Sequence, residues 1–480
     1  MRHSPFWSAV GALVALIVAH DALAQGYSVN EHSTCAMGRA GTAVASPCPD
    51  GSAMFYNPAG LALTRKGHGV LTVGGTFIAP TGSFTNDQTG LVSDLNTKVY
   101  PVPHVYATYG VTDRFAVGLG FFAPYGLTTD WPTTAEGRYA GYKSVIRGLY
   151  LQPTASFKIT DQIMVGGGFD IAFSHVELRQ RGPDLSTIPL PAPAPAGLTF
   201  GSLGIPSGTD FVDVNLHGNG TSAGFHAGVL LKASDRLSIG ARYLSRHNVK
   251  IDNGTVEITQ VATGLVLPPG NPITSNPPIS DPTQPFPVDP FLASFFGAGG
   301  PLSNQSGSTA LRYPEQWSFG AAGDVTSSLK LLFDVQLTNW KVFDTLMIKF
   351  ERLDPLGNGS NTVVYPEHFG RTTAYRFGGQ YSLGPATVVR LGYLFHNGAS
   401  PDQNVTPNLP EGNRNEFTAG FGTNLVSKLH LDLGYMYINQ ADRRGRSFPV
   451  LSGAPAPPVT TNGLYHFTAN LFAATLTYAF

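Results

Sequence analysis

Residues 220–224 match a motif that serves covalent catalysis in other proteins. The letters Gly220-Thr-Ser222-Ala-Gly224 fit the Gly-x-Ser-x-Gly pattern, in which a sharp turn between a strand and a helix exposes a serine nucleophile. Here a Gly-rich strand pattern contains the motif and no helix pattern follows, so we interpret the match as coincidental. The sequence contains no His-Glu-x-x-His motif, and two cysteines alone cannot form a four-ligand zinc site. We therefore expect no enzyme, and neither a metal nor another cofactor.

Four arginines are the other residues whose type and spacing suggest ligand binding. Each belongs to the polar set of a segment that alternates apolar and polar residues: Arg242, Arg246, Arg376 and Arg390. If the segments span a membrane as strands, a charge facing lipid costs roughly 2–4 kcal/mol near the midplane, so all four should face inward. One interpretation is a structural network with three carboxylates: Asp170, Asp334 and Asp432. The other is that one or two arginines hold a substrate carboxylate.

The N-terminus predicts export from the cytoplasm. Arg2 and His3 precede an apolar stretch from Phe6 to Ala19, and Ala22-Leu-Ala24 forms a small-residue cleavage site. Residues 1–24 are therefore predicted to be a signal peptide. Cys35 and Cys48 are the only two cysteines, and in an oxidising compartment we expect them to form a disulfide, with two free buried thiols as the alternative.

The composition excludes several classes of protein. The 480 residues carry a formal net charge of −1, which gives no indication of a nucleic-acid partner. Charged residues make up 13%, about half the share usual for a soluble protein. After residue 25, no apolar run approaches the roughly 20 residues that a spanning helix requires. A large soluble β-protein and a membrane β-barrel remain.

Alternation of apolar and polar residues predicts strands through most of the chain. From Leu429 to Tyr437 the odd positions are all apolar, whereas His430 and Asp432 are even. A period of two places the two sets on opposite faces of a sheet. The residues before position 67 lack such a pattern, so we divide the mature chain into an N-terminal segment, 25–66, and a strand region, 67–480.

The connections between the expected strands alternate strictly in length. Six are short, near residues 112, 160, 234, 326, 384 and 427. Seven are long, at 80–98, 124–142, 182–218, 257–308, 353–368, 398–414 and 444–464. Thirteen connections join fourteen strands, and short turns at one end with long loops at the other are typical of an outer-membrane barrel. The sequence thus predicts an all-β fold, a 14-stranded antiparallel transmembrane barrel.

The last strand, from His466 to Phe480, supports the same interpretation. It places Phe472, Leu476, Tyr478 and Phe480 on one face. A terminal strand that ends in Phe is the usual signal for the outer-membrane assembly machinery, which we expect to be a partner together with the outer-membrane lipids.

A set of short motifs resembles the family of outer-membrane transporters for long-chain fatty acids and aromatic hydrocarbons, the FadL/TodX type. In chain order they are Gly26-Tyr-Ser-Val-Asn-Glu-His-Ser33, Gly38-Arg-Ala40, Asn57-Pro-Ala-Gly-Leu61, Tyr125-Gly-Leu-Thr-Thr-Asp130, Pro314-Glu-Gln-Trp317, Asn339-Trp340, Ala374-Tyr-Arg376 and Thr477-Tyr-Ala-Phe480. They cover essentially the whole mature chain.

This resemblance implies a fold and a route for the cargo. It implies fourteen strands, and that residues 25–66 form a hatch in the lumen. It also implies an inward kink in the third strand, involving Phe121, Phe122, Pro124 and Gly126, that opens a gap in the wall and is contacted by the hatch motif Asn57, Pro58 and Ala59. Pro cannot donate a hydrogen bond to a β-ladder, and Gly in a strand often marks a bulge or a place where another backbone segment approaches closely. Sideways release into the bilayer would spare a long alkyl chain about 0.8 kcal/mol per methylene of exposure to water.

The predicted function is passive uptake of a hydrophobic small molecule by a monomer. A general diffusion porin and an outer-membrane lipid-modifying enzyme are the alternatives. Fatty-acid members tend to carry a basic residue where this chain has Pro366-Glu-His368, and an acidic residue there favours a neutral hydrocarbon over a carboxylate.

Overall fold

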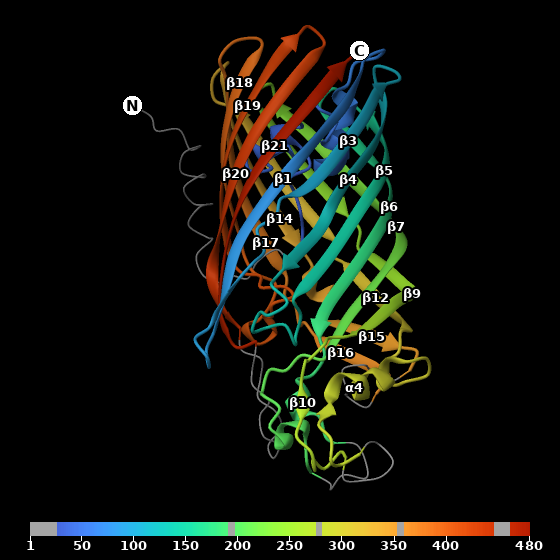
Figure 1. Cartoon of the computed structure of the whole chain (residues 1–480). Coiled ribbons are helices and arrows are strands. Elements are labelled where there is room, and N and C mark those ends of the chain that lie inside the picture. The colour runs from blue at the N-terminus through green and yellow to red at the C-terminus, as the bar shows by residue number, and fades with distance from the viewer. Residues whose placement is uncertain (1–25, 191–196, 275–280, 353–359, 446–460) are drawn as a thin grey trace.

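The computed structural model describes residues 26–190, 197–274, 281–352, 360–445 and 461–480, so the predicted signal peptide lies outside the described residues. The wall is a closed antiparallel barrel (Figure 1). Its fourteen strands are β1 (Gly69–Asn86), β3 (Tyr100–Gly110), β4 (Phe115–Asp130), β5 (Lys143–Lys158), β6 (Ile163–Arg181), β7 (Val212–Ser234), β8 (Leu237–Leu244) with β9 (His247–Gln260), β12 (Gln305–Tyr313) with β13 (Gln316–Asp324), β14 (Leu329–Thr338) with β15 (Thr345–Phe350), β16 (Thr362–Pro366) with β17 (Thr372–Ser382), β18 (Thr387–His396), β19 (Arg414–Val426), β20 (Leu429–Gly445) and β21 (Gly463–Ala479). Pairing of β1 with β21, from Val70–Ala479 to Asn86–Gly463, closes the barrel. The predicted fold class is confirmed.

The alternation of short turns and long loops is also confirmed. Short turns lie at one end of the barrel, and the long loops at the other end carry most of the remaining elements (Figure 1). These are β2 (Val92–Asp94), η2 (Leu185–Thr187), η3 (Phe200–Leu203), β10 (Val266–Leu267), β11 (Phe286–Pro287), α4 (Val288–Phe296) and η5 (Asp402–Asn404). Among the helices that the structure describes, none has the length and apolar character needed to cross a membrane.

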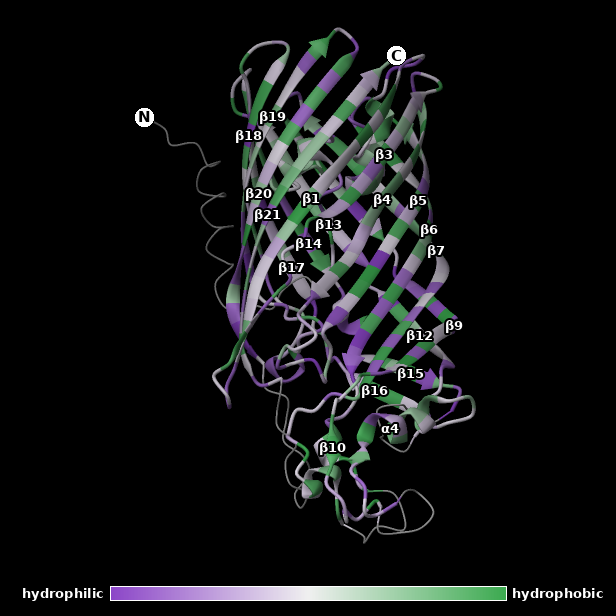
Figure 2. Ribbon diagram, in the orientation of Figure 1, coloured by the Kyte–Doolittle hydropathy of each residue, from purple (hydrophilic) through white to green (hydrophobic). Residues whose placement is uncertain are grey.

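Side chains alternate across the wall as the sequence predicts. In β14, Asp334 and Gln336 are buried, whereas Leu331 and Leu337 are about half exposed on the outer face. In β21, the outward set includes Phe472 and Tyr478. Hydrophobic and hydrophilic residues therefore alternate along the strands (Figure 2), with apolar groups where lipid would lie.

Four adjacent wall strands are interrupted. The breaks lie at residues 245–246, 314–315, 339–344 and 367–371, and the third contains η4 (Trp340–Val342). Pairing continues on both sides of the breaks, for example between β13 and β14 and again between β12 and β15. Each wall strand therefore continues beyond its break, and residues in the breaks can point out of the plane of the wall.

The N-terminal segment lies inside the barrel. It contains two short helices, α2 (Thr34–Met37) and α3 (Ala53–Tyr56), and the 3-10 helix η1 (Pro58–Leu63). Nearly every residue from 26 to 62 is buried. Helix α2 packs against β19, β20 and β21, whereas η1 packs against β5, β6 and β7, so the segment bridges separate parts of the wall.

Candidate functional site

The motif Asn57, Pro58 and Ala59 anchors the N-terminal segment to the wall. The Asn57 amide donates to the carbonyl oxygens of Val44 at 2.7 Å and Val229 at 2.9 Å, and its Oδ1 accepts from the Ala59 N–H at 3.2 Å. Glycine makes this approach possible, because a Cβ on Gly228 would lie 2.2 Å from Asn57 Oδ1. The motif therefore lies against β6, β7 and β8. Helix η1, which begins with Pro58 and Ala59, also contacts β4, and the expected contact of the motif with the kink stays a prediction.

Strand β4 is irregular at the place where the sequence leads us to expect the kink. Pairing with β3 runs from Gly110–Ala116 to Val105–Phe121 and then stops, and the register with β5 shifts between Phe122 and Tyr125. Beyond this point the segment around Ser28 pairs with β4. The Val29 N–H donates to Pro124 O at 2.9 Å, and the Gly126 N–H donates to Tyr27 O at 3.0 Å. The N-terminal segment thus covers the strand edge that β3 leaves unpaired.

An aromatic cluster fills the barrel at the level of the interrupted strands. The Tyr27 ring lies 4.5 Å from Trp340 and 5.5 Å from Phe343, centroid to centroid. The ring of Tyr125, in the kink, stacks on Tyr313 at 4.5 Å. The kink, the N-terminal segment and the strand breaks therefore meet in one packed group.

A cavity of about 990 Å³ opens above this cluster, towards the long loops. Its wall is largely apolar and includes Leu127, Ile146, Leu178, Leu216, Leu346, Ile348, Phe350, Val363 and Leu409, with Tyr27 and Phe343 from the aromatic cluster. This volume and lining suit an apolar small molecule with a few polar contacts. The sequence patterns did not identify these residues, because they belong to six strands and two loops far apart along the chain.

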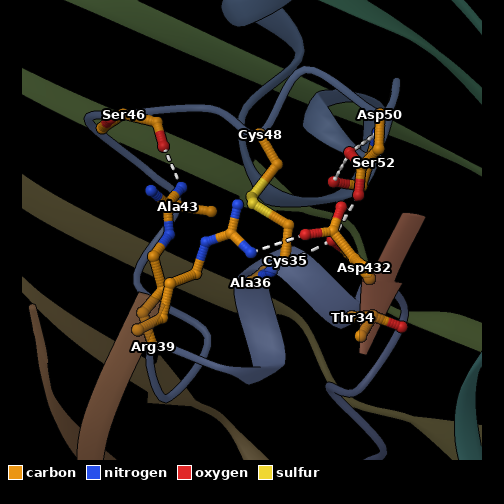
Figure 3. Close-up of a disulfide and its surroundings, with 12 residues drawn as sticks. Thr34, Cys35, Ala36, Arg39, Ala43, Ser46, Cys48, Asp50, Ser52 and Asp432 are labelled. Atoms are coloured by element: carbon orange, nitrogen blue, oxygen red, sulfur yellow. Dashed lines mark hydrogen bonds and ion pairs between the residues drawn. A yellow bond between two sulfur atoms is a disulfide. The ribbon is translucent and has the colours of Figure 1, made fainter. Parts of the chain in front are cut away.

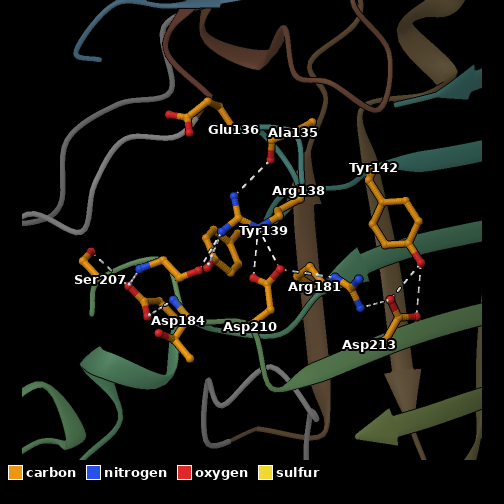
Figure 4. Close-up of polar contacts among 12 residues, drawn as sticks. Ala135, Glu136, Arg138, Tyr139, Tyr142, Arg181, Asp184, Ser207, Asp210 and Asp213 are labelled. Carbon is orange, nitrogen blue, oxygen red and sulfur yellow. Dashed lines mark hydrogen bonds and ion pairs between the residues drawn. The ribbon is translucent and has the colours of Figure 1, made fainter. Parts of the chain in front are cut away.

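Polar contacts link loop residues beside the cavity, which Tyr139 and Arg181 line (Figure 4). Arg138 donates from Nε to Asp210 at 2.9 Å and from Nη2 to the Tyr139 hydroxyl at 2.9 Å. Arg181 Nη1 donates to Asp213 at 2.6 Å. Loop 131–142 is thereby tied to loop 182–211, and the cations at the rim already have carboxylate partners.

Glu367 lies at the same cavity, in the break between β16 and β17. The acidic residue that the sequence singles out therefore lines the cavity, and its effect on a substrate carboxylate stays a prediction.

Three of the four predicted arginines face inward, below the cavity. Arg390 donates from Nη1 to Asp432 at 2.5 Å, and Arg376 donates from Nη2 to Gln336 at 2.9 Å. Arg242 donates to Gln316 at 2.9 Å and lies 4.3 Å from the centre of the Phe55 ring. None of the three lines the cavity, which fits the structural interpretation. Asp334 contributes differently from expectation, since it accepts from the N–H groups of Ala43 and Val44 in the N-terminal segment.

The prediction that Arg246 faces inward is wrong. Even positions face inward in β8, but the break after Leu244 shifts the parity, so that His247 and Val249 are buried and Arg246 is exposed. A two-residue period cannot reveal such a shift, because it is set by tertiary pairing.

The serine of the Gly-x-Ser-x-Gly match has neighbours that the sequence did not reveal. Ser222 Oγ lies 2.9 Å from His247 Nδ1, and His247 Nε2 lies 3.9 Å from Asp170 Oδ2. The strand–turn–helix that exposes a nucleophile is nevertheless missing, because β7 runs through the motif. Asp170 is also held by His226 at 2.7 Å and Gln152 at 2.6 Å, so these residues form a buried polar cluster of the wall.

Cys35 and Cys48 form a disulfide within the N-terminal segment (Figure 3). It links α2 to the loop that precedes α3. In the same loop, Asp50 accepts from the hydroxyls of Ser33 and Ser52, each at 2.5 Å. These bonds hold the segment as one compact unit.

A closed barrel with an apolar outer face, long loops at one end and a filled lumen defines a bacterial outer-membrane protein. The family described as "Outer membrane protein transport protein (OMPP1/FadL/TodX)" matches residues 15–480. The chain belongs to this family, which consists of transport proteins and not of enzymes, and it is located in the outer membrane.

Curated relatives cover nearly the full chain. The chain is 25% identical over 485 residues to the long-chain fatty acid transport protein of Escherichia coli O6:H1. The alignment covers 98% of each sequence. It is 24% identical over 438 residues to the long-chain fatty acid transport protein of Salmonella typhi, covering 89% of this chain and 90% of the relative.

Solved structures show the same fold. A Pseudomonas aeruginosa FadL homologue superposes with a TM-score of 0.71 at 21% identity, covering 95% of this chain and 99% of that one. The Pseudomonas putida toluene transporter TodX superposes with a TM-score of 0.63 at 14% identity, covering 95% and 99%.

Proposed function

We propose that this protein mediates passive uptake of hydrophobic small molecules, long-chain fatty acids or aromatic hydrocarbons, across the outer membrane. Cargo enters the 990 Å³ cavity from the side of the long loops. Residues 25–66 act as a hatch whose movement opens a path from the cavity floor to the kink in β4, and cargo leaves sideways into the bilayer.

One observation carries this proposal. Tyr27 lines the cavity, and its carbonyl oxygen accepts a hydrogen bond from Gly126 in the kink. The floor of the cavity and the cover of the unpaired β4 edge are therefore the same few residues. A displacement of Tyr27 to Val29 would open both together.

The names of the relatives support the class of cargo. The matched proteins include fatty acid transport proteins and a toluene transporter. The mostly apolar cavity suits both. The packed N-terminal segment argues against a general diffusion porin, because an open pore requires an unfilled lumen.

The test is a bulky side chain at Gly126. A Cβ there would lie 3.3 Å from Val29, so Gly126→Ala should have a small effect, whereas Gly126→Arg should obstruct the route. We expect uptake of labelled oleate or toluene to fall about tenfold or more in Gly126→Arg cells at matched surface expression, equivalent to a barrier increase of roughly 1.4 kcal/mol.

The matched control is Gly297→Arg, because Gly297 is exposed and an added Cβ would come no closer than 3.8 Å to another part of the chain, at Ser294 O. Uptake in this variant should equal that of the parent. Undiminished uptake in Gly126→Arg would exclude lateral exit at the kink, and a steady porin-like conductance of the parent would favour the diffusion porin instead.

A further inference from the structure

The wall is dented between β7 and β9, near the kink, since Arg147 of β5 lies beside the dent and is the register partner of Gly126 in β4. Registered pairs between β7 and β9 end at His217–Thr255, and pairs between β7 and β8 begin at His226–Leu244. Between them, residues 218–224 of β7, all of which are described, pair only with β6. Gly220 lets β9 come close, since a Cβ on it would lie 2.3 Å from Lys250 O. This irregularity leaves a groove of about 1300 Å³ that opens on the outer face and reaches the inward side chains of Ser174 and Ser222.

The groove lies where the apolar outer face of the barrel ends. In the direction of the long loops, outward Phe173 of β6 gives way to outward His175. In the same direction, outward Leu149 of β5 gives way to Arg147. Figure 2 shows hydrophilic colouring on β6 and β7 towards the end with α4. Just beside the groove, three aromatic rings stand in a row, with Tyr243 5.5 Å from Phe225 and 4.6 Å from Trp317. Rings of this kind mark the membrane–water interface, here on the side of the long loops, which is the outer leaflet.

Three cations line this groove without a protein partner. Arg147, Arg246 and Lys250 are exposed there and make no ion pair or side-chain hydrogen bond with the described residues. Asp252 is the single carboxylate in the described lining.

Cations slightly further out on the same strands behave differently. Lys143 and Arg179 both bind Glu177, at 3.1 and 2.5 Å, and Arg181 binds Asp213 at 2.6 Å. The chain therefore neutralises its basic residues at the loop rim and leaves those of the groove available.

We propose that this groove binds the phosphate groups of a phosphorylated lipid of the outer leaflet. The guanidinium groups of Arg147 and Arg246 and the Lys250 ammonium supply charge-assisted donors for phosphate oxygens. Leu149 and Phe173 offer apolar surface on the membrane side, against which the acyl chains lie. A basic cluster at this depth gains from the anionic lipid surface, whereas a free anion would lack the contact with the apolar residues.

The experiment measures binding of lipid A with two phosphates to the full-length protein in detergent micelles. The triple variant Arg147→Gln, Arg246→Gln, Lys250→Gln should bind lipid A at least about tenfold more weakly than the parent, because each cation near an anionic lipid strengthens binding. The matched control removes three exposed cations at the short-turn end: Arg114→Gln, Lys232→Gln and Arg236→Gln. It changes the net charge equally and should bind like the parent.

A second measurement uses only the parent protein, so it does not depend on folding of a variant. Lipid A without phosphates should bind about tenfold or more weakly than the diphosphorylated form. Equal binding of the two forms, or equal loss in both triple variants, would overturn the proposal. Inorganic phosphate that competes at the same concentration as lipid A would show a site for free phosphate instead and would also overturn it.

Discussion

The wall has two irregular places with opposite surroundings. At the kink, β4 leaves β3 after Phe121, and the uncovered edge is paired by residues of the N-terminal segment among buried aromatic rings. At the dent, β7 loses its partner on β9, and the groove outside is lined by cations. In both places glycine permits close approach of another part of the chain.

The difference shows that an interrupted ladder does not by itself define a route. The side chains beside the interruption decide what occupies it. At the kink the occupant is the protein's own N-terminus, which also forms the floor of an apolar cavity. At the dent, Ser222 lines the groove and lies 2.9 Å from His247, so a buried polar cluster forms the inner side of the groove.

Deleting residues 25–66 should have the largest effect, and it should affect the kink but not the dent. The deletion removes the cover of the kink and the filling of the lumen but no wall strand. We expect a barrel that inserts and conducts ions continuously, measured in planar bilayers, because the lumen becomes water-filled.

The dent should not depend on that segment. The triple variant of the groove arginines and lysine should therefore remain as closed as the parent in the same bilayer assay. Failure of the deleted chain to insert, or an unchanged conductance, would refute the hatch assignment.

Tyr27→Ala should have the next largest effect, because Tyr27 belongs to both the cavity floor and the kink cover. Loss of its ring removes the contacts with Trp340 and Phe343, and large aromatic-to-alanine changes in packed sites cost about 3–5 kcal/mol. We expect intermittent ion leakage and lower cargo affinity, measured by conductance and uptake.

Tyr27→Phe is the matched control. The hydroxyl makes only a 3.4 Å contact with Arg312 O, so this variant should behave like the parent. Equal leakage in both variants would mean that ring packing is not what holds the segment.

Replacing Cys35 and Cys48 by Ser should loosen the N-terminal segment without altering the dent. Closing a loop of this length restricts the unfolded chain by about 3 kcal/mol in the simple entropy model. We expect faster proteolysis within residues 26–66 and unchanged binding of lipid A. Thiol labelling of denatured, unreduced protein checks the bond itself, and two reactive thiols there would contradict it.

The smallest expected effect concerns charge in the cavity. Glu367 lines the cavity, and a carboxylate there would repel the carboxylate of a fatty acid. Glu367→Gln should therefore raise uptake of oleate modestly and leave uptake of toluene unchanged. Equal uptake of oleate by the variant and the parent would show that the charge of Glu367 does not influence the cargo.

The class of fold follows from local patterns in the amino-acid sequence. Alternation places Leu331 outside and Asp334 inside without knowledge of any partner strand, because the two faces of a strand differ in a period of two residues. Loop lengths gave the number of strands, and Pro124 with Gly126 gave the position of the kink. These are local properties, which neighbouring residues encode.

Contacts between distant groups depend on the folded barrel. The break after Leu244 turns Arg246 outward, Asn57 binds the Val229 carbonyl of β7, and Ser222 reaches His247. The cavity likewise needs side chains from β4 to β16 at one level. Shifts of register and contacts between remote segments depend on how the closed wall pairs, and no local period records that pairing.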